Sequence, residues 1–393
     1  MGRIAPHVER LPKSGIRKFF DIVAQSKDVI SLGVGEPDFD TPWHISRAAT
    51  TCLENGGTHY TSNSGTPELR SAIARYMERR FAAKYAPENE ILVTVGVSEA
   101  IDLAIRALVS PGDEVLYHEP CFVSYAAAIR LAHGTPVKVE TRAEDSFKLT
   151  VEALERKVSP RTRALLINFP CNPTGATLDR DETRAILEFA KAHDLIVLSD
   201  EVYAELCYED PLPETLTGCG SFPEYRDRVV VLNGFSKGWA MTGYRLGYAC
   251  GPADIIDAMM KIHQYGIMSA PTLSQAAGTE ALDFGDKDVD RMRREYKRRR
   301  DYMVESLNAM GLATLKPDGA FYLFCDVRKT GQTSEEFAMT LLKDYGVACV
   351  PGEAFGECGN GFVRMSYASS MEKLRAAIER IGRYCKERGV PQS

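Results

Sequence analysis

A lysine and an arginine stand eight residues apart in the stretch NGFSKGWAMTGYRLG, residues 233–247. Lys237 has small residues around it and follows the apolar run 229–232, a predicted buried strand. A lysine amine that burial keeps neutral can serve as a nucleophile or as a general base. An ordinary surface lysine is the alternative, and the residues that follow the other predicted strands bear on that choice.

Groups that could bind a ligand, either polar side chains or the free N–H groups of a turn, also follow three other apolar runs that are predicted strands. These runs, each with the residues after it, are 91–95 with Gly96, Val97 and Ser98, 164–168 with Asn172, and 195–199 with Asp200 and Tyr203. Free backbone N–H groups at a helix start bind anions, and residues 96–98 open a helical pattern. Ligands of an open parallel sheet bind outside the carboxyl ends of its strands, so these groups are expected to meet at one edge.

Each of these features also has a plain structural explanation. A glycine before a helix is usually only a turn, and the sequence NPTG at 172–175 is a favourable β-turn by itself. Asp200 is also suited to a helix N-cap, and Arg245 to pairing with a nearby carboxylate. A single ligand site explains all four strand ends at once, and we therefore favour it.

One cofactor uses all of these groups. Pyridoxal phosphate needs a lysine to bind it covalently, an anion site for its phosphate and a partner for its pyridine nitrogen. We therefore expect Lys237 to bind it, the turn at 96–98 to bind its phosphate and Asp200 to keep its ring nitrogen protonated. The residues suited to its ring hydroxyl and its ring face are Asn172, Tyr203 and Phe122.

The pattern of elements supports such a site. Runs that are apolar throughout indicate strands buried on both faces of a mainly parallel sheet, and helical patterns such as 182–192 separate several of them. Repeated βα units predict an α/β fold with a three-layer αβα large domain at residues 45–285. The expected strands are 91–95, 114–117, 164–168, 195–199, 229–232 and 246–250.

A smaller α+β domain is expected at residues 286–393, with the N-terminal arm 1–44 packed against it. Its elements are predicted at 288–307, 334–345 and 371–387 for helices and at 320–324 and 362–365 for strands. The basic run 297–300 suits nucleic acid, but acids flank it and the chain carries a net charge of −6. We therefore favour a solvated helix face for that run.

The composition describes an ordinary globular protein. Its 393 residues are 44% apolar and 26% charged, which suits two domains. Ten cysteines without a C-x-x-C pair favour reduced thiols in the cytoplasm over disulfides or a zinc site. We find no apolar run long enough to cross a membrane and no secretory signal in the first residues, so a cytoplasmic location is expected.

The chain resembles the class I and II (fold-type I) pyridoxal-phosphate aminotransferases, in the branch that holds bacterial and archaeal aspartate and aromatic enzymes. The stretch GFSKGWAMTGYRLG at 234–247 matches the family's lysine-site signature. Other matches in the family's order are GEPDFDTP (35–42), HYTSNSGTPELR (59–70), NPTG (172–175), SDEVY (199–203), PDGAFY (317–322) and FVRMSYASS (362–370).

The resemblance implies a role for each matching residue. The implied catalytic residues are Lys237, Asp200 and Tyr203. The phosphate contacts would come from Gly96, Val97, Ser98, Arg245 and, across a homodimer, Tyr60 of a neighbouring subunit. The substrate contacts would come from Gly35, Asn172, Arg364 for the α-carboxylate, and a closing segment with Ile16 and Arg17. An arginine paired with a core acid is the alternative for Arg364.

Two positions depart from the family pattern. Many relatives carry Ser or Thr at the position of Gly234, where the hydroxyl contacts phosphate, and Ser236 is the candidate replacement. The ring-stacking position, often Trp or Tyr, is Phe122. Stacking survives that change, whereas a polar contact from the ring edge is lost.

The resemblance implies transfer of an amino group from an L-amino acid of the aspartate or aromatic type to a 2-oxo acid such as 2-oxoglutarate, with ping-pong kinetics. A carbon–sulfur β-lyase on the same scaffold is an open alternative, because it shares the lysine, aspartate and arginine. A regulator that binds the cofactor would need an added DNA-binding module. A nicotinamide dehydrogenase would need G-x-G-x-x-G after its first strand, which is absent. No residue identifies the preferred side chain.

Overall fold

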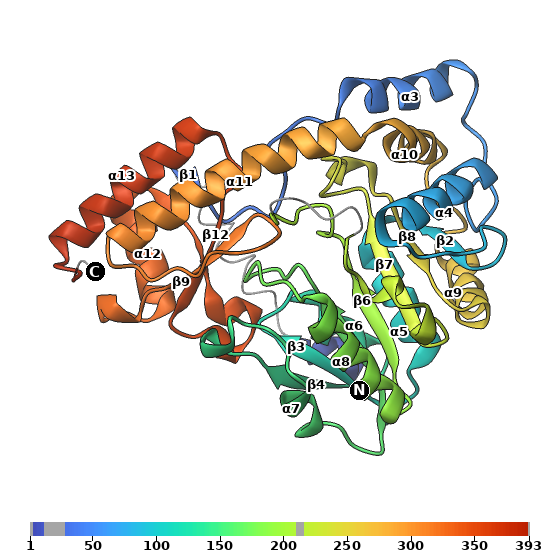
Figure 1. Ribbon diagram of the computed structural model, residues 1–393, viewed down its shortest axis with the longest axis horizontal. Coiled ribbons are helices and arrows are strands. Elements are labelled where there is room, and N and C mark those ends of the chain that lie inside the picture. Colours follow the sequence, from blue (N-terminus) through green and yellow to red (C-terminus); the bar gives the residue numbers. More distant parts are fainter. Residues whose placement is uncertain (1–2, 12–27, 210–215, 392–393) are drawn as a thin grey trace.

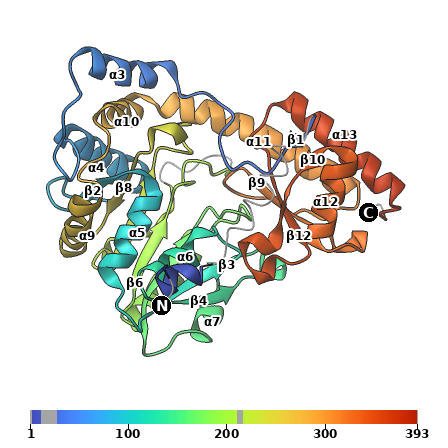
Figure 2. The same cartoon turned by 180° about the vertical axis from the view of Figure 1, so that it is seen from behind.

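The structure is a computed structural model that describes residues 3–11, 28–209 and 216–391 (Figure 1). Its larger part is built on a seven-stranded sheet, and its smaller part on a three-stranded sheet. The long helix α11 (Asp286–Ala309) runs from the larger part to the smaller part in both views (Figures 1 and 2). The architecture is therefore the predicted α/β fold with a second, smaller α+β unit.

The large sheet has the order β2-β8-β7-β6-β5-β3-β4. Its strands are β2 (Ile91–Thr94), β3 (Glu114–Glu119), β4 (Thr135–Glu140), β5 (Thr162–Asn168), β6 (Ile196–Asp200), β7 (Val229–Gly234) and β8 (Gly247–Cys250). Strand β8 pairs antiparallel with both neighbours, and the other neighbouring pairs are parallel. The mainly parallel sheet is confirmed.

Strand β7 shows why the strands are apolar on both faces. Val229 and Val231 pack into the core on one face, while Val230 and Leu232 pack into the core on the other. The first face carries α4 (Pro67–Phe81), α8 (Arg180–Ala192) and α10 (Thr272–Phe284), and the second carries α5 (Gly96–Leu108), α6 (Ser124–Leu131) and α9 (Ala253–Gly266). The layers helix, sheet and helix are the predicted ones.

The smaller part has an antiparallel sheet of order β11-β12-β9. Its elements are β9 (Tyr322–Asp326), β11 (Val350–Pro351), β12 (Phe362–Ser366), α12 (Ser334–Tyr345) and α13 (Met371–Glu387). The N-terminal arm contacts both parts: β1 (Ile30–Ser31) pairs parallel with β10 (Val347–Ala348), whereas the His7 ring lies 4.7 Å from the ring of His133, just after α6.

Local signals set the ends of the helices. At the start of α12, the Thr333 hydroxyl accepts from the Glu336 N–H, and the Glu336 carboxylate accepts from the Thr333 N–H. The helix ends at Gly346, whose φ of +65° suits glycine. None of the helices in the described ranges is long and apolar enough to cross a membrane.

Helix α11 corrects one expectation. The basic run 297–300 was predicted to be a solvated face, but Arg299 and Arg300 are 5% and 2% exposed. Arg299 pairs with Asp38 and Glu295, and Arg300 donates to the Pro317 carbonyl. Arg300 also pairs with the adjacent Asp301. The periodicity of the sequence missed this burial because it does not show that Asp38 and Pro317, which are distant in the chain, pack against the helix.

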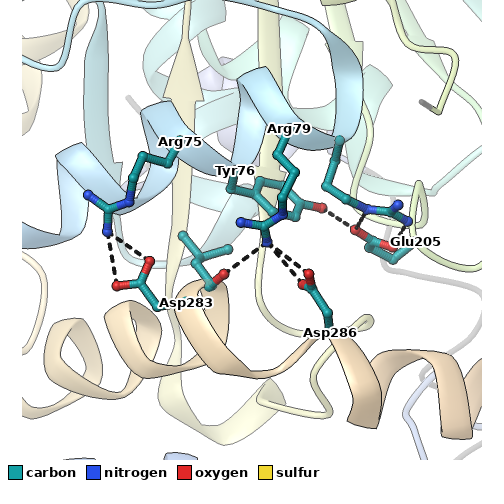
Figure 3. Close-up of polar contacts among 8 residues, drawn as sticks. Arg75, Tyr76, Arg79, Glu205, Asp283 and Asp286 are labelled. Carbon is teal, nitrogen blue, oxygen red and sulfur yellow. Dashed lines mark hydrogen bonds and ion pairs between the residues drawn. The ribbon is translucent and has the colours of Figure 1, made fainter. Parts of the chain in front are cut away.

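Helix α4 is tied by polar contacts to three other segments (Figure 3). Arg75 pairs with Asp283, and Arg79 pairs with Asp286 and donates to the Leu282 carbonyl. The Glu205 carboxylate accepts from the Tyr76 hydroxyl at 2.8 Å and from Arg80 at 3.0 and 2.8 Å. Glu205 follows Tyr203 closely in the chain, so these contacts link α4 to the loop after β6.

Candidate active site

A cavity of about 390 Å³ lies at the carboxyl ends of the parallel strands and reaches the smaller part. The predicted site residues that line it are Gly35, Val97, Ser98, Phe122, Asn172, Asp200, Tyr203, Lys237, Arg245 and Arg364. The residues after four strands and from both parts of the chain therefore meet in one place, which is the arrangement that the strand ends predicted.

Lys237 lies just after β7, with its side chain turned into the cavity. Its Nζ donates a hydrogen bond to the Gly35 carbonyl at 2.7 Å. Burial lowers the pKa of Lys237 to about 8, although the nearby Glu36 carboxylate opposes the shift. The surface-lysine alternative is thereby excluded, and a neutral, nucleophilic amine is accessible near neutral pH.

Asp200 ends β6 and is 4% exposed. Its Oδ2 accepts from the Tyr125 hydroxyl at 2.7 Å and its Oδ1 from the Val202 N–H at 3.2 Å. Burial raises the pKa of Asp200 to about 6, and the two donors only partly offset that shift. No ion pair of Asp200 occurs within the described ranges, so this carboxylate faces the cavity without a counterion.

Tyr125 is a site residue that the sequence reasoning missed. It lies in the first turn of α6, three residues after Phe122, and its ring contacts the Phe122 ring edge-on at 5.8 Å. The one-turn spacing from Phe122 was the available signal. Its partner Asp200 is 75 residues away in sequence, so the hydrogen bond itself could not be read from the chain.

Arg364 lies in the middle of β12 and is 3% exposed. Its guanidinium donates to the Asn172 side-chain oxygen at 2.8 Å and to the Gly33 carbonyl at 2.6 Å, while its Nε has no partner. No carboxylate pairs with it in the described part of the chain, which removes the core-acid alternative there. A buried cation with neutral partners favours an anionic ligand.

The turn NPTG serves structure and site together. Gly175 has a φ of +70°, and a Cβ there would lie 2.3 Å from Pro317, so the turn requires glycine. Asn172 meanwhile presents its side-chain oxygen to Arg364. Tyr203, across the cavity, shares a hydrogen bond of 2.9 Å with the Tyr322 hydroxyl, a second residue absent from the predictions.

At the predicted anion site, the backbone of the turn lies very close to the Arg245 guanidinium and to the backbone of Gly247. Gly96 has a φ of +76°, and a Cβ on it would lie 2.7 Å from the Arg245 Nη2. A Cβ on Gly247 would lie 2.6 Å from the Val97 nitrogen. The guanidinium therefore packs on a glycine turn whose first N–H groups have no partner within α5, and this combination suits a phosphate.

The departure at Gly234 has a steric reason. A Cβ on Gly234 would lie 2.9 Å from the Val97 side chain and 3.0 Å from the Gly247 Cα. A hydroxyl-bearing side chain therefore does not fit there without a shift of the backbone. Ser236, the candidate replacement, is buried and lines the cavity.

Two of the predicted residues, Tyr60 and Gly96, do not line the cavity, and two more cannot be placed. Tyr60 is 83% exposed, and its neighbours His59 and Thr61 are hydrogen-bonded to Thr272 and Gln275. Ile16 and Arg17 lie outside the described residues. Gly96 belongs to the anion turn but does not itself line the cavity wall.

Residues 27–381 match the family model for aminotransferase class I and II. The chain belongs to this family. An aspartate aminotransferase of Pyrococcus abyssi is 46% identical to it, over 95% of this chain and 96% of the relative. An aromatic-amino-acid aminotransferase of Thermococcus litoralis is 42% identical, over 98% of this chain and 99% of the relative.

The fold of this aminotransferase matches solved structures as well. The crystal structure of an aromatic aminotransferase from Pyrococcus horikoshii has a TM-score of 0.90 and 46% identity, and the match covers 96% of this chain and 100% of that chain. The fold-type I architecture is confirmed.

Members of this family use pyridoxal phosphate, and so does this aminotransferase. The residues present fit that group: a half-buried lysine with a lowered pKa, a buried carboxylate without a counterion and a glycine turn packed against a guanidinium. The protonated ring nitrogen of the cofactor would pair with the carboxylate, and its phosphate dianion would bind to the glycine turn and the guanidinium.

Proposed function

We propose that this aminotransferase moves an amino group from an L-amino acid of the aspartate or aromatic type to 2-oxoglutarate, with Lys237 as its catalytic lysine. The observation that carries the proposal is the Lys237 amine, held at 2.7 Å from the Gly35 carbonyl in the same cavity as Arg364. An amine and a buried guanidinium facing one cavity suit a substrate with a proton to lose at Cα and an α-carboxylate to bind.

Pyridoxal phosphate supplies the electron sink that makes the Cα proton of an amino acid removable. Lys237 would hold it covalently, and Asp200 would pair with its ring nitrogen. Its remaining contacts would be Asn172 and Tyr203 at the ring oxygen, Phe122 on the ring face, and Gly96, Val97, Ser98 and Arg245 at the phosphate.

Lys237 would also act as the general base at Cα. Burial lowers the pKa of Lys237 to about 8, which favours the neutral amine that accepts the proton. Arg364 would orient the substrate through its carboxylate, exchanging the Asn172 and Gly33 oxygens for carboxylate oxygens. The two substrates would bind to these same groups in turn, and the first product would leave before the second substrate enters, which gives ping-pong kinetics.

Replacing the lysine tests the proposal. We expect Lys237→Ala to abolish transamination and the visible absorbance of the covalently bound cofactor, because the amine is the group that binds it. The matched control is Lys84→Ala, a lysine with a 79% exposed side chain on the surface, which should leave both unchanged. A Lys237→Ala protein with wild-type turnover contradicts the assignment.

The choice of amino acid needs its own measurement. The relatives above are named as aspartate and aromatic aminotransferases, which supports either preference. Conversion of the bound cofactor by a panel of amino acids, without a 2-oxo acid, ranks the donors by the loss of absorbance. Steady turnover that needs no 2-oxo acid would instead support the β-lyase, which the aminotransferase relatives do not favour.

We also propose a cytoplasmic homodimer that shares its sites through Tyr60. Large apolar side chains stand exposed at Tyr60 (83%) and at Tyr265 (89%) and Met268 (44%), which precede Thr272 in the sequence. The Thr272 hydroxyl donates to the carbonyl of His59, the residue before Tyr60. Ten free cysteines support a reducing compartment. Light scattering should give a mass of twice the 43.5 kDa of one chain. Tyr60→Phe should weaken cofactor binding. A monomer with full activity contradicts the proposal.

A further inference from the structure

Glu99, in the first turn of α5, makes two bonds beside the anion turn. Its Oε2 accepts from the Val95 N–H at 2.5 Å, and its Oε1 lies 2.7 Å from the His263 Nδ1. Val95 is the residue before Gly96 and makes no side-chain cap for the helix. The Glu99 side chain, which lies within the helix, therefore accepts a hydrogen bond from the backbone at the helix start, where no N-cap side chain does so.

His263 comes from α9 on the same face of the sheet and is fully buried. Its Nε2 has no partner in the described part of the chain, so the bond to Glu99 is its sole polar side-chain contact there. The surroundings of α5 and α9 are apolar, with Ile105, Ile256 and Met259 in one core. An apolar residue would suit such a place at least as well for stability alone.

The pair acts on the backbone that leads into the turn. The Thr94 hydroxyl donates to the Gly96 carbonyl at 3.0 Å, and Glu99 holds the Val95 N–H between them. Hydrogen bonds from Thr94 and to Glu99 thus hold the backbone of the turn, and His263 in turn holds the Glu99 carboxylate. Loss of His263 frees the carboxylate to leave Val95, while the turn keeps its glycines.

We propose that Glu99 and His263 are positioning residues for the phosphate of the cofactor. They hold residues 95–98 so that the N–H groups of the turn and the guanidinium of Arg245, which packs against Gly96, can bind the same phosphate. The inference rests on the proposed function, because it takes the turn at Gly96 as the phosphate site.

The test compares two probes that differ only in the phosphate: pyridoxal 5′-phosphate and pyridoxal. In the cofactor-free protein, His263→Leu should raise the dissociation constant of pyridoxal phosphate by about tenfold or more, as loss of a supporting partner does in metal sites. The dissociation constant of pyridoxal should not change, since pyridoxal makes no contact with the turn. His263→Asn should restore the phosphate preference, because its amide nitrogen replaces the Nδ1 donor.

The matched control is His44→Leu. The His44 Nδ1 lies at the same 2.7 Å from Glu280, but this pair joins α3 (Trp43–Glu54) to α10 and does not touch the turn. We expect it to leave the ratio of the two dissociation constants unchanged. If His263→Leu does not fold, Glu99→Ala is measured in the same way with the same expectation.

An unchanged ratio in His263→Leu, or an equal weakening of both probes, overturns the inference and leaves the proposed function standing. A wild-type protein that binds both probes equally overturns the phosphate site, and the inference with it. The two failures are therefore distinguishable in one set of titrations.

Discussion

At the residue scale, the fold does little to stabilise the carboxylate of Asp200. Its folded pKa of about 6 is above the ordinary value of 3.8, because burial outweighs the Tyr125 and Val202 donors. The folded chain therefore binds the proton more tightly, and the stability that this gives below pH 3.8 is lost as the pH rises through 6. At pH 7 Asp200 is ionised, and its burial then lowers the free energy of unfolding of the cofactor-free protein.

Asp200→Asn should therefore stabilise the cofactor-free protein at pH 7. We expect a gain of about 1–3 kcal/mol in the free energy of unfolding, and a gain near zero below pH 4, where Asp200 is protonated. Urea unfolding at the two pH values measures it. Asp227→Asn, on a side chain that is 67% exposed, is the control. A loss of stability at pH 7 would contradict the cause given for the shifted pKa.

The sequence could predict those candidate residues whose neighbours in the chain mark the end of a strand. Lys237 and Asp200 directly follow apolar runs, and the carboxyl ends of parallel strands meet. Tyr125 and Tyr322 could not be found this way, because each is defined by a partner more than 70 residues away. Gly234 was noticed as a departure, but its crowding by Val97 and Gly247 is a property of the packed sheet.

At the element scale, the start of α5 requires a glycine at position 96. Gly96→Ala adds a Cβ at a φ of +76° and 2.7 Å from the Arg245 guanidinium. We expect a loss of about 1–2 kcal/mol in stability from the backbone strain. We also expect weaker binding of pyridoxal phosphate, because the guanidinium must move.

Gly56→Ala is the matched control for that variant. Gly56 has nearly the same φ, +79°, but no atom lies within 4 Å of an added Cβ. It should lose the same stability and keep its cofactor affinity. Thermal unfolding and cofactor titration of both proteins distinguish the effect of backbone strain on stability from the effect of the displaced guanidinium on cofactor binding. Equal cofactor affinities in the two variants would show that Arg245 is not displaced.

Elements with complete local signals were predicted to the residue. Helices α12 and α13 begin after the hydroxyl caps Thr333 and Ser370, and their predicted bounds are confirmed. Strand β4 was missed, because at the sheet edge it buries only part of its side chains and has no continuous apolar run.

At the scale of the whole molecule, α4 joins the loop of Tyr203 to the start of α11 through unequal contacts (Figure 3). The Arg80 and Glu205 side chains are 17% and 8% exposed, whereas the Arg75 side chain is 56% exposed. Glu205→Gln leaves a buried guanidinium without its counterion, and we expect it to cost about 3 kcal/mol of unfolding free energy.

The matched control is Arg75→Ala, which breaks the exposed pair with Asp283 on the same helix. It should cost at most about 1 kcal/mol, because water screens exposed ion pairs. Urea unfolding compares the two proteins. Similar losses in both would mean that burial does not distinguish these pairs.

The two-part architecture was predictable because the strand and helix patterns change character near residue 286. For the N-terminal arm, packing against the smaller part was expected and residues 30–32 lie there, but the individual contacts of the arm were not predictable. Strand β1 joins β10, while His7 lies against His133, and neither two-residue strands nor ring contacts leave a pattern in the sequence.

The pairing of β1 with β10 has a consequence for biosynthesis. Ile30 is paired with Val347, and Leu32 lies in the core of the smaller part, so this early segment finds its partners only when the chain is nearly complete. At a translation rate of 5–20 residues per second, the delay is about 15–60 s. During that time its apolar side chains are available to chaperones, and a ribosome that stalls before residue 347 leaves them uncovered.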